Sequence, residues 1–288
     1  MNGAGSVGAV MCAAAERLAA AGIDSARLDA RVLMGFALGR DAGWLIGHRD
    51  DALSAADADR FEGLLARREA RAPLAYITGE REFWSLSFRV TPATLIPRPE
   101  TETLIETVLA AFPNRDAAFR ILDLGTGSGC ILLALLHERP RASGVGIDAS
   151  AAALDVAAAN AEALGLSGRC EFRLGSWFST LADREVFDAV VTNPPYVTSA
   201  EMEELPPEVA GHEPEGALAA GGDGLDAYRD ILPGLAGRLR PGGFFAGEIG
   251  WRQGEAAVAL ARDHGLEGVE IRADGAGRAR VLTASMAG

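Results

Sequence analysis

The sequence predicts an α/β fold, in which a small helical domain precedes a doubly wound, mostly parallel sheet with a terminal antiparallel hairpin. Three features of the 288 residues support this prediction. Near the N-terminus, apolar residues recur at intervals of three and four, which is typical of amphipathic helices. From Phe119 onward, short apolar runs alternate with amphipathic stretches, and a glycine-rich loop follows the first run. With 49% hydrophobic residues, the chain can bury the core that two domains require.

Residues 1–72 are expected to form the helical domain, because their Ala/Leu/Arg-rich sequence keeps a helical apolar period. Ser54, followed by Asp57, is a favourable start for one of these helices. The apolar positions that define the period are Leu28, Val32, Leu33, Phe36, Phe61, Leu64 and Leu65. Turns between the earlier helices are expected at Gly39, Gly43 and Gly47.

Residues 73–92 are predicted to form a β-hairpin linker. Between Phe83 and Val90 apolar and polar residues nearly alternate, which is the period of a strand, and Gly79 suits the turn before it. In the next segment, Pro97 and Pro99 prevent a helix until Pro99 itself can occupy a first helical turn. A helix is therefore expected over residues 99–111.

Residues 93–288 are assigned to the sheet domain. Five apolar runs predict its strands, and the prediction places helices between them. A helix near residues 252–264 is expected to precede the hairpin, whose strands 269–272 and 280–283 flank an Asp-Gly-Ala-Gly turn at residues 274–277. The five predicted strands are residues 120–124, 144–147, 170–174, 187–192 and 244–248.

Composition excludes several classes of function. The net charge of −13 opposes binding to a polyphosphate backbone, so nucleic acid is not an expected partner. All cationic side chains are Arg, which rules out a P-loop lysine or a Schiff-base lysine. The three cysteines and four histidines have neither disulfide nor metal-ligand spacing, so we expect buried thiols and no metal. No apolar run approaches the roughly 18 residues of a membrane span, and no signal peptide is evident, so a cytoplasmic location is expected.

A cofactor site is predicted where the first strand of the sheet ends. There the loop Gly125-Thr126-Gly127-Ser128-Gly129 opens a helix whose free N–H groups can face a ligand. Asp148 ends the second strand, where a carboxylate can accept hydrogen bonds from a ribose diol. The spacing of the glycines, G-x-G-x-G, favours a nucleoside such as S-adenosylmethionine over a dinucleotide. The helix residue Cys130 is expected to pack under the sheet.

An acceptor site is predicted at Asn193-Pro194-Pro195-Tyr196, directly after a buried strand. The prolines form a rigid bend and contribute no N–H groups. The side-chain oxygen of Asn193 and the carbonyl of Pro194 can accept two N–H groups of a planar amide or exocyclic amine, and Tyr196 can pack on that group. Such a site orients a weakly nucleophilic nitrogen for methyl transfer without a strong base.

The chain resembles the peptide chain release factor N5-glutamine methyltransferases, which have a Rossmann-like class I methyltransferase domain. The resemblance covers nearly the whole chain. It is carried by the glycine loop with Asp148, the Asn193–Tyr196 segment and four further segments, which are residues 73–79, 83–84, 96–101 and 213–225.

The resemblance implies a specific reaction and specific roles. The methyl acceptor would be the glutamine of a Gly-Gly-Gln loop in class-I release factors, with the helical domain helping to recognise that protein. Gly125–Gly129 and Asp148 would hold S-adenosylmethionine, Trp177 would pack near its adenine, and Asn193–Tyr196 would hold the glutamine. Relatives often carry Asp immediately before this tryptophan, whereas this chain has Ser176, whose hydroxyl can still accept a hydrogen bond.

Two other acceptors share these motifs. A glutamine of a ribosomal protein would need the same hydrogen bonds to its side-chain amide. Residues 73–79 and 96–101, however, resemble the release-factor methyltransferases more than the ribosomal-protein methyltransferases. An adenine N6 amine in DNA or RNA would also fit the tetrapeptide, but the acidic composition argues against it. Glu248 ends a predicted strand, and no role is assigned to it from the sequence.

Overall fold

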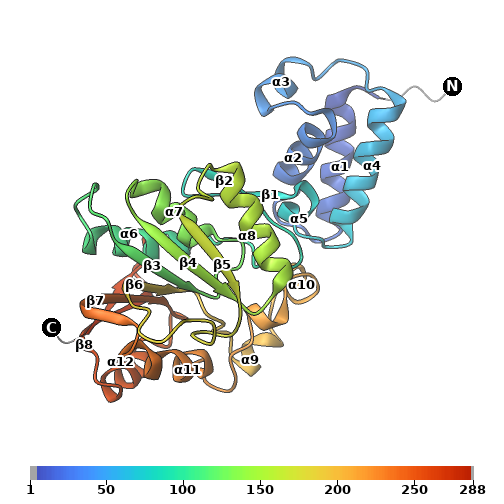
Figure 1. The fold of residues 1–288 in the computed structure, drawn as a ribbon. Coiled ribbons are helices and arrows are strands. Elements are labelled where there is room, and N and C mark those ends of the chain that lie inside the picture. Colours follow the sequence, from blue (N-terminus) through green and yellow to red (C-terminus); the bar gives the residue numbers. More distant parts are fainter. Residues whose placement is uncertain (1–4, 287–288) are drawn as a thin grey trace. The chain divides into compact units, whose positions relative to one another are not determined.

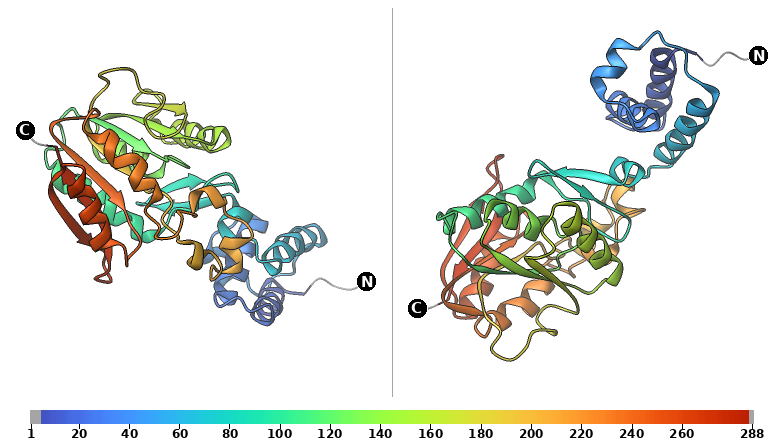
Figure 2. Two further views of the ribbon diagram at one scale, coloured as in Figure 1. Left: turned by 90° about the horizontal axis from the view of Figure 1, so that it is seen from below. Right: turned by 45° about the horizontal axis from the view of Figure 1, so that its top comes forward.

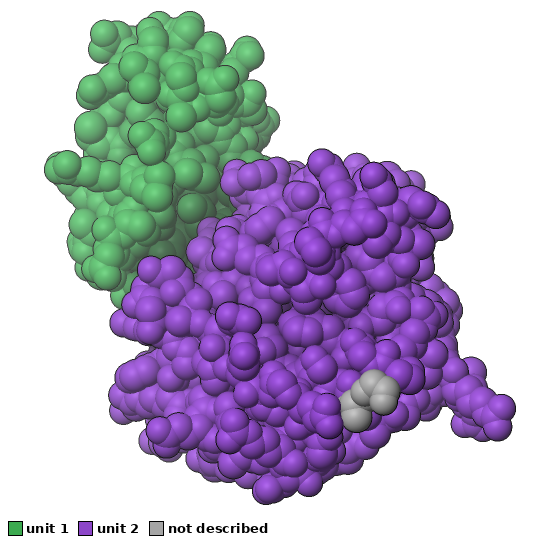
Figure 3. Space-filling view, turned by 90° about the vertical axis from the view of Figure 1, so that its left-hand side faces the viewer, with its two compact units in different colours: residues 1–79, 207–212 green, residues 80–206, 213–288 purple. Residues whose placement is uncertain are grey.

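The computed structural model describes residues 5–286, which are drawn as ribbons in Figures 1 and 2. These residues form two compact units, coloured separately in Figure 3. One unit comprises the described residues up to Gly79 together with Pro207–His212. The other comprises Glu80–Pro206 and the described residues from Glu213 onward. No helix among residues 5–286 is long and apolar enough to cross a membrane.

The first unit is helical, as the N-terminal period predicts. Ser54 begins one of its helices, and the Ser54 Oγ accepts a hydrogen bond from the Asp57 backbone N–H at 3.1 Å. The core of the unit contains Leu18, Leu33 and Phe61, all at most 1% exposed. The helices are α1 (Val7–Ala20), α2 (Ala26–Leu38), α3 (Ala42–Gly47), α4 (Ala55–Glu69), α5 (Leu74–Thr78) and α10 (Pro207–Ala210).

Helices α5 and α10 are not predicted by the sequence pattern. The short helix α5 occupies the first part of the segment that we expected to be a hairpin linker. Helix α10 lies in sequence between two segments of the second unit but belongs to the first, where Glu208 accepts hydrogen bonds from Arg68 and Arg71 at 3.2 and 2.9 Å. Arg68 also forms a buried ion pair with Asp29 at 2.8 Å. These long-range charge contacts leave no periodic signal in the sequence.

Some local expectations for the first unit are wrong. Gly43 and Gly47 do not mark turns but lie within α3, which begins because the Asp41 side chain accepts from the Trp44 N–H at 2.7 Å. Leu28 and Phe36 are each 49% exposed, since α2 turns Leu33 and its neighbours toward the core instead.

The cysteine expectation is wrong for Cys12, which is exposed, whereas Cys130 and Cys170 are half-buried. Helix α1 directs Ala14 and Leu18 into the core, and Cys12 lies outside that face.

The second unit begins with an antiparallel hairpin of β1 (Glu80–Phe83) and β2 (Leu86–Arg89). Trp84 and Ser85 connect the strands with φ of 52° and 57°, the left-handed pair that a two-residue hairpin turn requires. The 3₁₀ turn η1 (Pro99–Thr101) then leads into α6 (Glu102–Ala111). The predicted helix at 99–111 is therefore present, with a tighter first turn.

A seven-stranded sheet is the centre of the second unit, in the order β5-β4-β3-β6-β7-β9-β8. The first five strands of that order are parallel, and β9 and β8 form the terminal antiparallel hairpin. This confirms the predicted fold class. The strands are β3 (Arg120–Leu124), β4 (Ser143–Asp148), β5 (Cys170–Leu174), β6 (Phe187–Thr192), β7 (Leu239–Glu248), β8 (Glu267–Ala273) and β9 (Ala279–Ser285).

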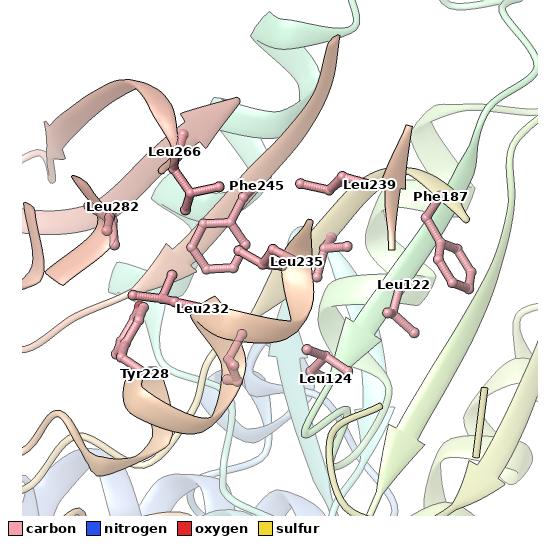
Figure 4. Packing of buried hydrophobic residues seen from close by; sticks show 14 of the residues in the cluster. Leu122, Leu124, Phe187, Tyr228, Leu232, Leu235, Leu239, Phe245, Leu266 and Leu282 are labelled. Atoms are coloured by element: carbon pink, nitrogen blue, oxygen red, sulfur yellow. The ribbon is translucent and has the colours of Figure 1, made fainter. Parts of the chain in front are cut away.

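Helices cover both faces of this sheet, as the ribbons show (Figures 1 and 2). On one face, Leu122 and Leu124 of β3 pack with residues of α11 and α12, including Tyr228 and Leu232 (Figure 4). On the other, Ile121 packs with residues of α6, α7 and α8. Successive β3 side chains thus enter different cores, as strand geometry requires. Besides α6, the helices of this unit are α7 (Cys130–Glu138), α8 (Ala151–Ala163), α9 (Ser199–Met202), η2 (Glu215–Ala217), α11 (Asp226–Leu235) and α12 (Gly254–Asp263).

Candidate active site

The carboxyl ends of five parallel strands meet at one edge of the sheet, where open α/β proteins bind ligands. A cavity of about 440 Å³ lies there within the second unit. The cavity is lined by residues at the carboxyl ends of four strands. These residues are Gly125–Ser128, Asp148–Ser150, Gly175–Trp177, Asn193 and Pro195. The structure therefore brings the predicted cofactor and acceptor segments onto one cavity, although they are up to about 70 residues apart in sequence.

The glycine loop turns sharply between β3 and α7. Gly125, Gly127 and Gly129 have φ of 69°, 56° and 78°, values that favour glycine. At Gly129, a Cβ would also approach the side chains of Leu133 and Ala157 to 3.1 and 3.2 Å. The loop is thus held in a conformation that presents backbone to the cavity.

Buried polar groups fix this loop from below. The Thr126 hydroxyl donates to Asp123 Oδ2 at 2.7 Å, and both residues are buried. Burial raises the pKa of the Asp123 carboxyl to about 7, against its usual value near 4. Ser128 is also buried and lines the cavity beside Thr126.

Asp148 lies on the cavity wall at the end of β4 and supports the loop. Its Oδ2 accepts from the Gly127 N–H at 2.8 Å, and its Oδ1 accepts from the Ser150 N–H at 2.9 Å. Each carboxylate oxygen has a second lone pair that can accept a hydrogen bond from a ligand. The carboxylate can therefore hold the glycine loop and a bound diol at the same time.

Ser176 and Trp177 form another part of the wall, after β5. Trp177 has a left-handed φ of 46°, and its ring lies 3.9 Å from the position that a Cβ would take on Gly125. The indole Nε1–H donates to Asp230 Oδ2 at 3.3 Å. The ring also packs against the core below it, so Trp177 is at once a packing residue and a cavity residue.

Asn193 lines the cavity and has an unused hydrogen-bond acceptor. Its Nδ2 donates to Thr101 Oγ1 at 3.2 Å, while its Oδ1 is buried and has no hydrogen-bond partner among the described residues. A buried polar atom without a partner costs folding free energy, and a bound N–H group would satisfy it.

Pro194 and Tyr196 are not among the described residues that line the cavity, although Pro195 is. Pro194 is buried. The Tyr196 hydroxyl donates to Glu248 Oε1 at 3.1 Å, and burial raises the pKa of this phenol above its usual value near 10. The Tyr196 carbonyl accepts from Gln253 Nε2 at 2.8 Å. Tyr196 is therefore held by the end of β7 and the start of α12.

Several cavity residues carry no role in the sequence analysis. Arg98 and Thr101 line the wall from the segment before α6. Glu213 anchors that segment, since its carboxylate accepts from the Arg98 guanidinium and from the Ile96 N–H, and its side chain is 1% exposed. Cys130 also lines the cavity rather than only packing under the sheet, and burial raises the pKa of its thiol to about 12. The sequence pattern at Ile96–Thr101 could have indicated that this segment lines the cavity.

No group of three or more His, Cys, Asp or Glu side chains within residues 5–286 is placed to hold a metal ion. The polar residues on the cavity instead include serines and threonines, Asp148, Asn193, Arg98 and Cys130. These groups suit hydrogen bonding to a nucleoside and to an amide.

Known families match both units of the chain. Residues 10–79 match the PrmC N-terminal domain, and residues 100–222 match the methyltransferase small domain. The release factor glutamine methyltransferase of Cereibacter sphaeroides is 50% identical over 274 residues, which cover 95% of this chain and 96% of that protein. The chain belongs to the release factor glutamine methyltransferase family. The recognition made from the sequence motifs is thereby confirmed, and the protein is a methyltransferase.

Other members of the family are similarly close. The release factor glutamine methyltransferase of Rhodospirillum rubrum is 43% identical over 278 residues, covering 96% of this chain and 84% of that protein. The one from Moorella thermoacetica is 46% identical over 272 residues, covering 94% and 95%.

Solved structures agree with this family in fold. The catalytic domain of hMettl16 in complex with the MAT2A 3′UTR hairpin 6 has a TM-score of 0.56 at 21% identity, over 78% of this chain and 81% of that one. The Thermus thermophilus 16S rRNA N2 G1207 methyltransferase RsmC, in complex with AdoMet and guanosine, has a TM-score of 0.52 at 20% identity, over 72% and 49%. At such identities the likeness concerns the fold alone.

Proposed function

We propose that this methyltransferase transfers the methyl group of S-adenosylmethionine to the side-chain amide nitrogen, N5, of the glutamine in the Gly-Gly-Gln motif of class-I peptide chain release factors. The observation that carries the proposal is the buried, unpartnered Oδ1 of Asn193 on the same cavity as the glycine loop and Asp148. The names of the relatives support a release-factor glutamine as the acceptor.

The donor end of the cavity fits an adenosyl group. Gly125–Gly129 would hold the donor through backbone groups, and Asp148 would accept from the ribose diol through its free lone pairs. Trp177 and Ser176 would lie against the adenine. When bound, S-adenosylmethionine would supply an electrophilic methyl group.

The acceptor end fits a primary amide. An amide nitrogen is a poor nucleophile because its lone pair is delocalised into the carbonyl. Acceptance of one N–H by Asn193 Oδ1 and of the other by the Pro194 carbonyl would orient the nitrogen toward the donor and stabilise the positive charge that develops on it. Tyr196, anchored on Glu248, would support the rigid bend that carries both acceptors.

The protein substrate would be recognised partly by the helical unit of residues 1–72, with residues 73–92 as a linker and residues 93–288 as the catalytic domain. The match of residues 10–79 to the PrmC N-terminal domain supports a separate N-terminal unit. The net charge of −13 favours a protein acceptor over a nucleic acid backbone.

Mass spectrometry of a purified class-I release factor, after incubation with enzyme and S-adenosylmethionine, tests the proposal. We expect a mass gain of one methyl on the Gly-Gly-Gln glutamine, lost in Asn193→Ala and kept in the matched control Asn114→Ala, which changes an exposed loop asparagine. A ribosomal protein with a candidate glutamine, and adenine-containing DNA and RNA, belong in parallel reactions. Preferential methylation of either, or of another release-factor residue, would contradict the proposal.

A further inference from the structure

A buried asparagine on α8 joins the hairpin strand β2 to the glycine loop. Asn160 is 2% exposed and is not among the described residues that line the cavity. Its Oδ1 accepts from the Arg89 N–H at 2.7 Å. Its Nδ2 donates to the Arg89 carbonyl at 3.0 Å and to the Ser128 carbonyl at 2.8 Å. One side chain thus holds the backbone of two residues that are 71 and 32 residues away in sequence.

The partners of this side chain require an amide. Arg89 presents one N–H and one carbonyl, and Ser128 presents a second carbonyl, so the side chain must supply one acceptor and two donors. An asparagine amide has both donors on one nitrogen, whereas a carboxylate has no donor and a hydroxyl has one. The reversed amide would place Oδ1 against both carbonyls. The partners therefore also determine the orientation of the Asn160 amide.

The glycine loop is held from two sides. On the β4 side, the Ile147 carbonyl accepts from the N–H groups of Gly125 and Thr126 at 2.8 and 3.0 Å. On the α8 side, Asn160 donates to the Ser128 carbonyl. Because Ser128 lines the cavity, this second contact fixes the backbone of a cavity residue from outside the cavity.

The other partner of Asn160 leads to a different wall of the cavity. Arg89 is the last residue of β2, and residues 93–95, which follow it closely, line the cavity. A turn connects the two, in which the Thr94 N–H donates to the Thr91 carbonyl at 2.9 Å. Asn160 therefore links the glycine loop to the wall formed by residues 93–95.

We propose that Asn160 is a positioning residue for the methyl donor, because it holds the glycine loop and the wall of residues 93–95 at the spacing that binds S-adenosylmethionine. The inference rests on the donor part of the proposed function and does not depend on which protein accepts the methyl group. Coupling between sites is reciprocal, so bound S-adenosylmethionine should in turn stabilise the end of β2 at Arg89.

Two substitutions at position 160 test the effect on the donor. Asn160→Leu keeps a side chain of similar size without hydrogen-bonding groups, and Asn160→Ala removes most of the side chain. We expect both to raise the Kd for S-adenosylmethionine in calorimetry about tenfold, as is typical of residues that orient a binding group from behind. In methylation assays the KM for S-adenosylmethionine should rise similarly, while kcat at saturating donor stays within about twofold.

Arg139→Leu is the matched control for a general loss of stability. Arg139 is 7% exposed and donates to the carbonyls of Leu109 and Phe112 at 3.0 and 2.8 Å, and it is not among the described residues that line the cavity. Urea denaturation should show that this variant is destabilised as the Asn160 variants are, yet its Kd should not change. A Kd that rises equally in Arg139→Leu, or that stays unchanged in the Asn160 variants, would overturn the proposal.

Hydrogen exchange in the unchanged protein tests the reciprocal effect and does not require a variant to fold. The Arg89 N–H should exchange more slowly when S-adenosylmethionine is bound. The control is the Arg120 N–H at the start of β3, which donates to Asp188 Oδ2 at 2.7 Å and lies at the opposite edge of the sheet. Exchange at Arg89 that slows no more than exchange at Arg120 would overturn the inference.

The same measurements separate the inference from the proposed function. If the unchanged protein does not bind S-adenosylmethionine in calorimetry, the proposed function fails and the inference fails with it. If the unchanged protein binds S-adenosylmethionine but the Asn160 variants bind it equally well, only the inference about Asn160 fails.

Discussion

Replacement of Asp148 by asparagine is expected to weaken the binding of S-adenosylmethionine strongly. Both carboxylate oxygens accept backbone N–H groups, from Gly127 at 2.8 Å and from Ser150 at 2.9 Å. An asparagine has only one acceptor oxygen, so its NH₂ group must face one of these two donors. The asparagine therefore has fewer acceptor sites left for the ribose diol, and the loss of one hydrogen bond between the diol and a charged group corresponds to about 1.5–3 kcal/mol, which is about a tenfold to hundredfold rise in Kd.

Isothermal titration calorimetry of the Asp148→Asn variant with S-adenosylmethionine measures this loss directly. The matched control is Asp155→Asn, which makes the same change on the exposed face of α8 and should keep the Kd of the unchanged protein. Circular dichroism at the titration temperature verifies that the variant is folded. An unchanged Kd for Asp148→Asn would refute the view that this carboxylate organises the glycine loop around the donor.

Three further predictions concern the same edge of the sheet. A Cβ at Gly146 would lie 2.8 Å from Phe172 Cδ1, so Gly146→Ala should lower the free energy of unfolding, measured in urea, by about 1–3 kcal/mol. The control Gly168→Ala should lower it little, because no atom lies within 4 Å of that Cβ position. Equal stabilities of the two variants would count against this packing. Because the pKa of Asp123 is raised to about 7, the folded state retains a proton that the unfolded state loses, and the free energy of unfolding should fall as pH rises from about 4 to about 7. Asp123→Asn should flatten this pH dependence. Parallel curves of unfolding free energy against pH for the variant and the unchanged protein would contradict the prediction. Trp177→Ala should raise the Kd for S-adenosylmethionine about tenfold, because the contact between the indole ring and the adenine is lost. Calorimetry measures this change, and an unchanged Kd would mean that the ring serves only in packing.

The predicted strands agree closely with the structure, and the central ones are buried on both faces, whereas β5 at the sheet edge is only partly buried. The runs at residues 120–124, 170–174 and 187–192 coincide with β3, β5 and β6, and the others differ only in length. Parallel strands between two layers of helices need apolar side chains on both sides, and this need leaves a continuous apolar run in the sequence. The carboxyl ends of such strands lie at one edge, so the meeting of the glycine loop, Asp148 and Asn193 could also be anticipated.

Expectations failed where burial depends on distant partners. Nothing local distinguishes Leu33, which is buried, from Phe36, which is 49% exposed, because the neighbouring helices decide which face of α2 is covered. Helix α10 packs with the first unit through the Glu208 contacts with Arg68 and Arg71, which are about 140 residues away in sequence. Pairing between distant charges has no period and leaves no pattern to read.

By itself, the sequence determined the fold class, the positions of the strands, the glycine loop with its acidic partner, and the segment that presents Asn193. These features depend on local backbone requirements and on apolar periodicity, and both can be recognised from residues that are close together in the sequence. Only the tertiary structure decided that Asn193 donates to Thr101, that the Tyr196 hydroxyl donates to Glu248, and that the side-chain oxygen of Asn193 is left without a partner among the described residues. The reason is physical: a hydrogen bond between buried side chains depends on distance and direction, and folding sets both by bringing together segments more than 50 residues apart.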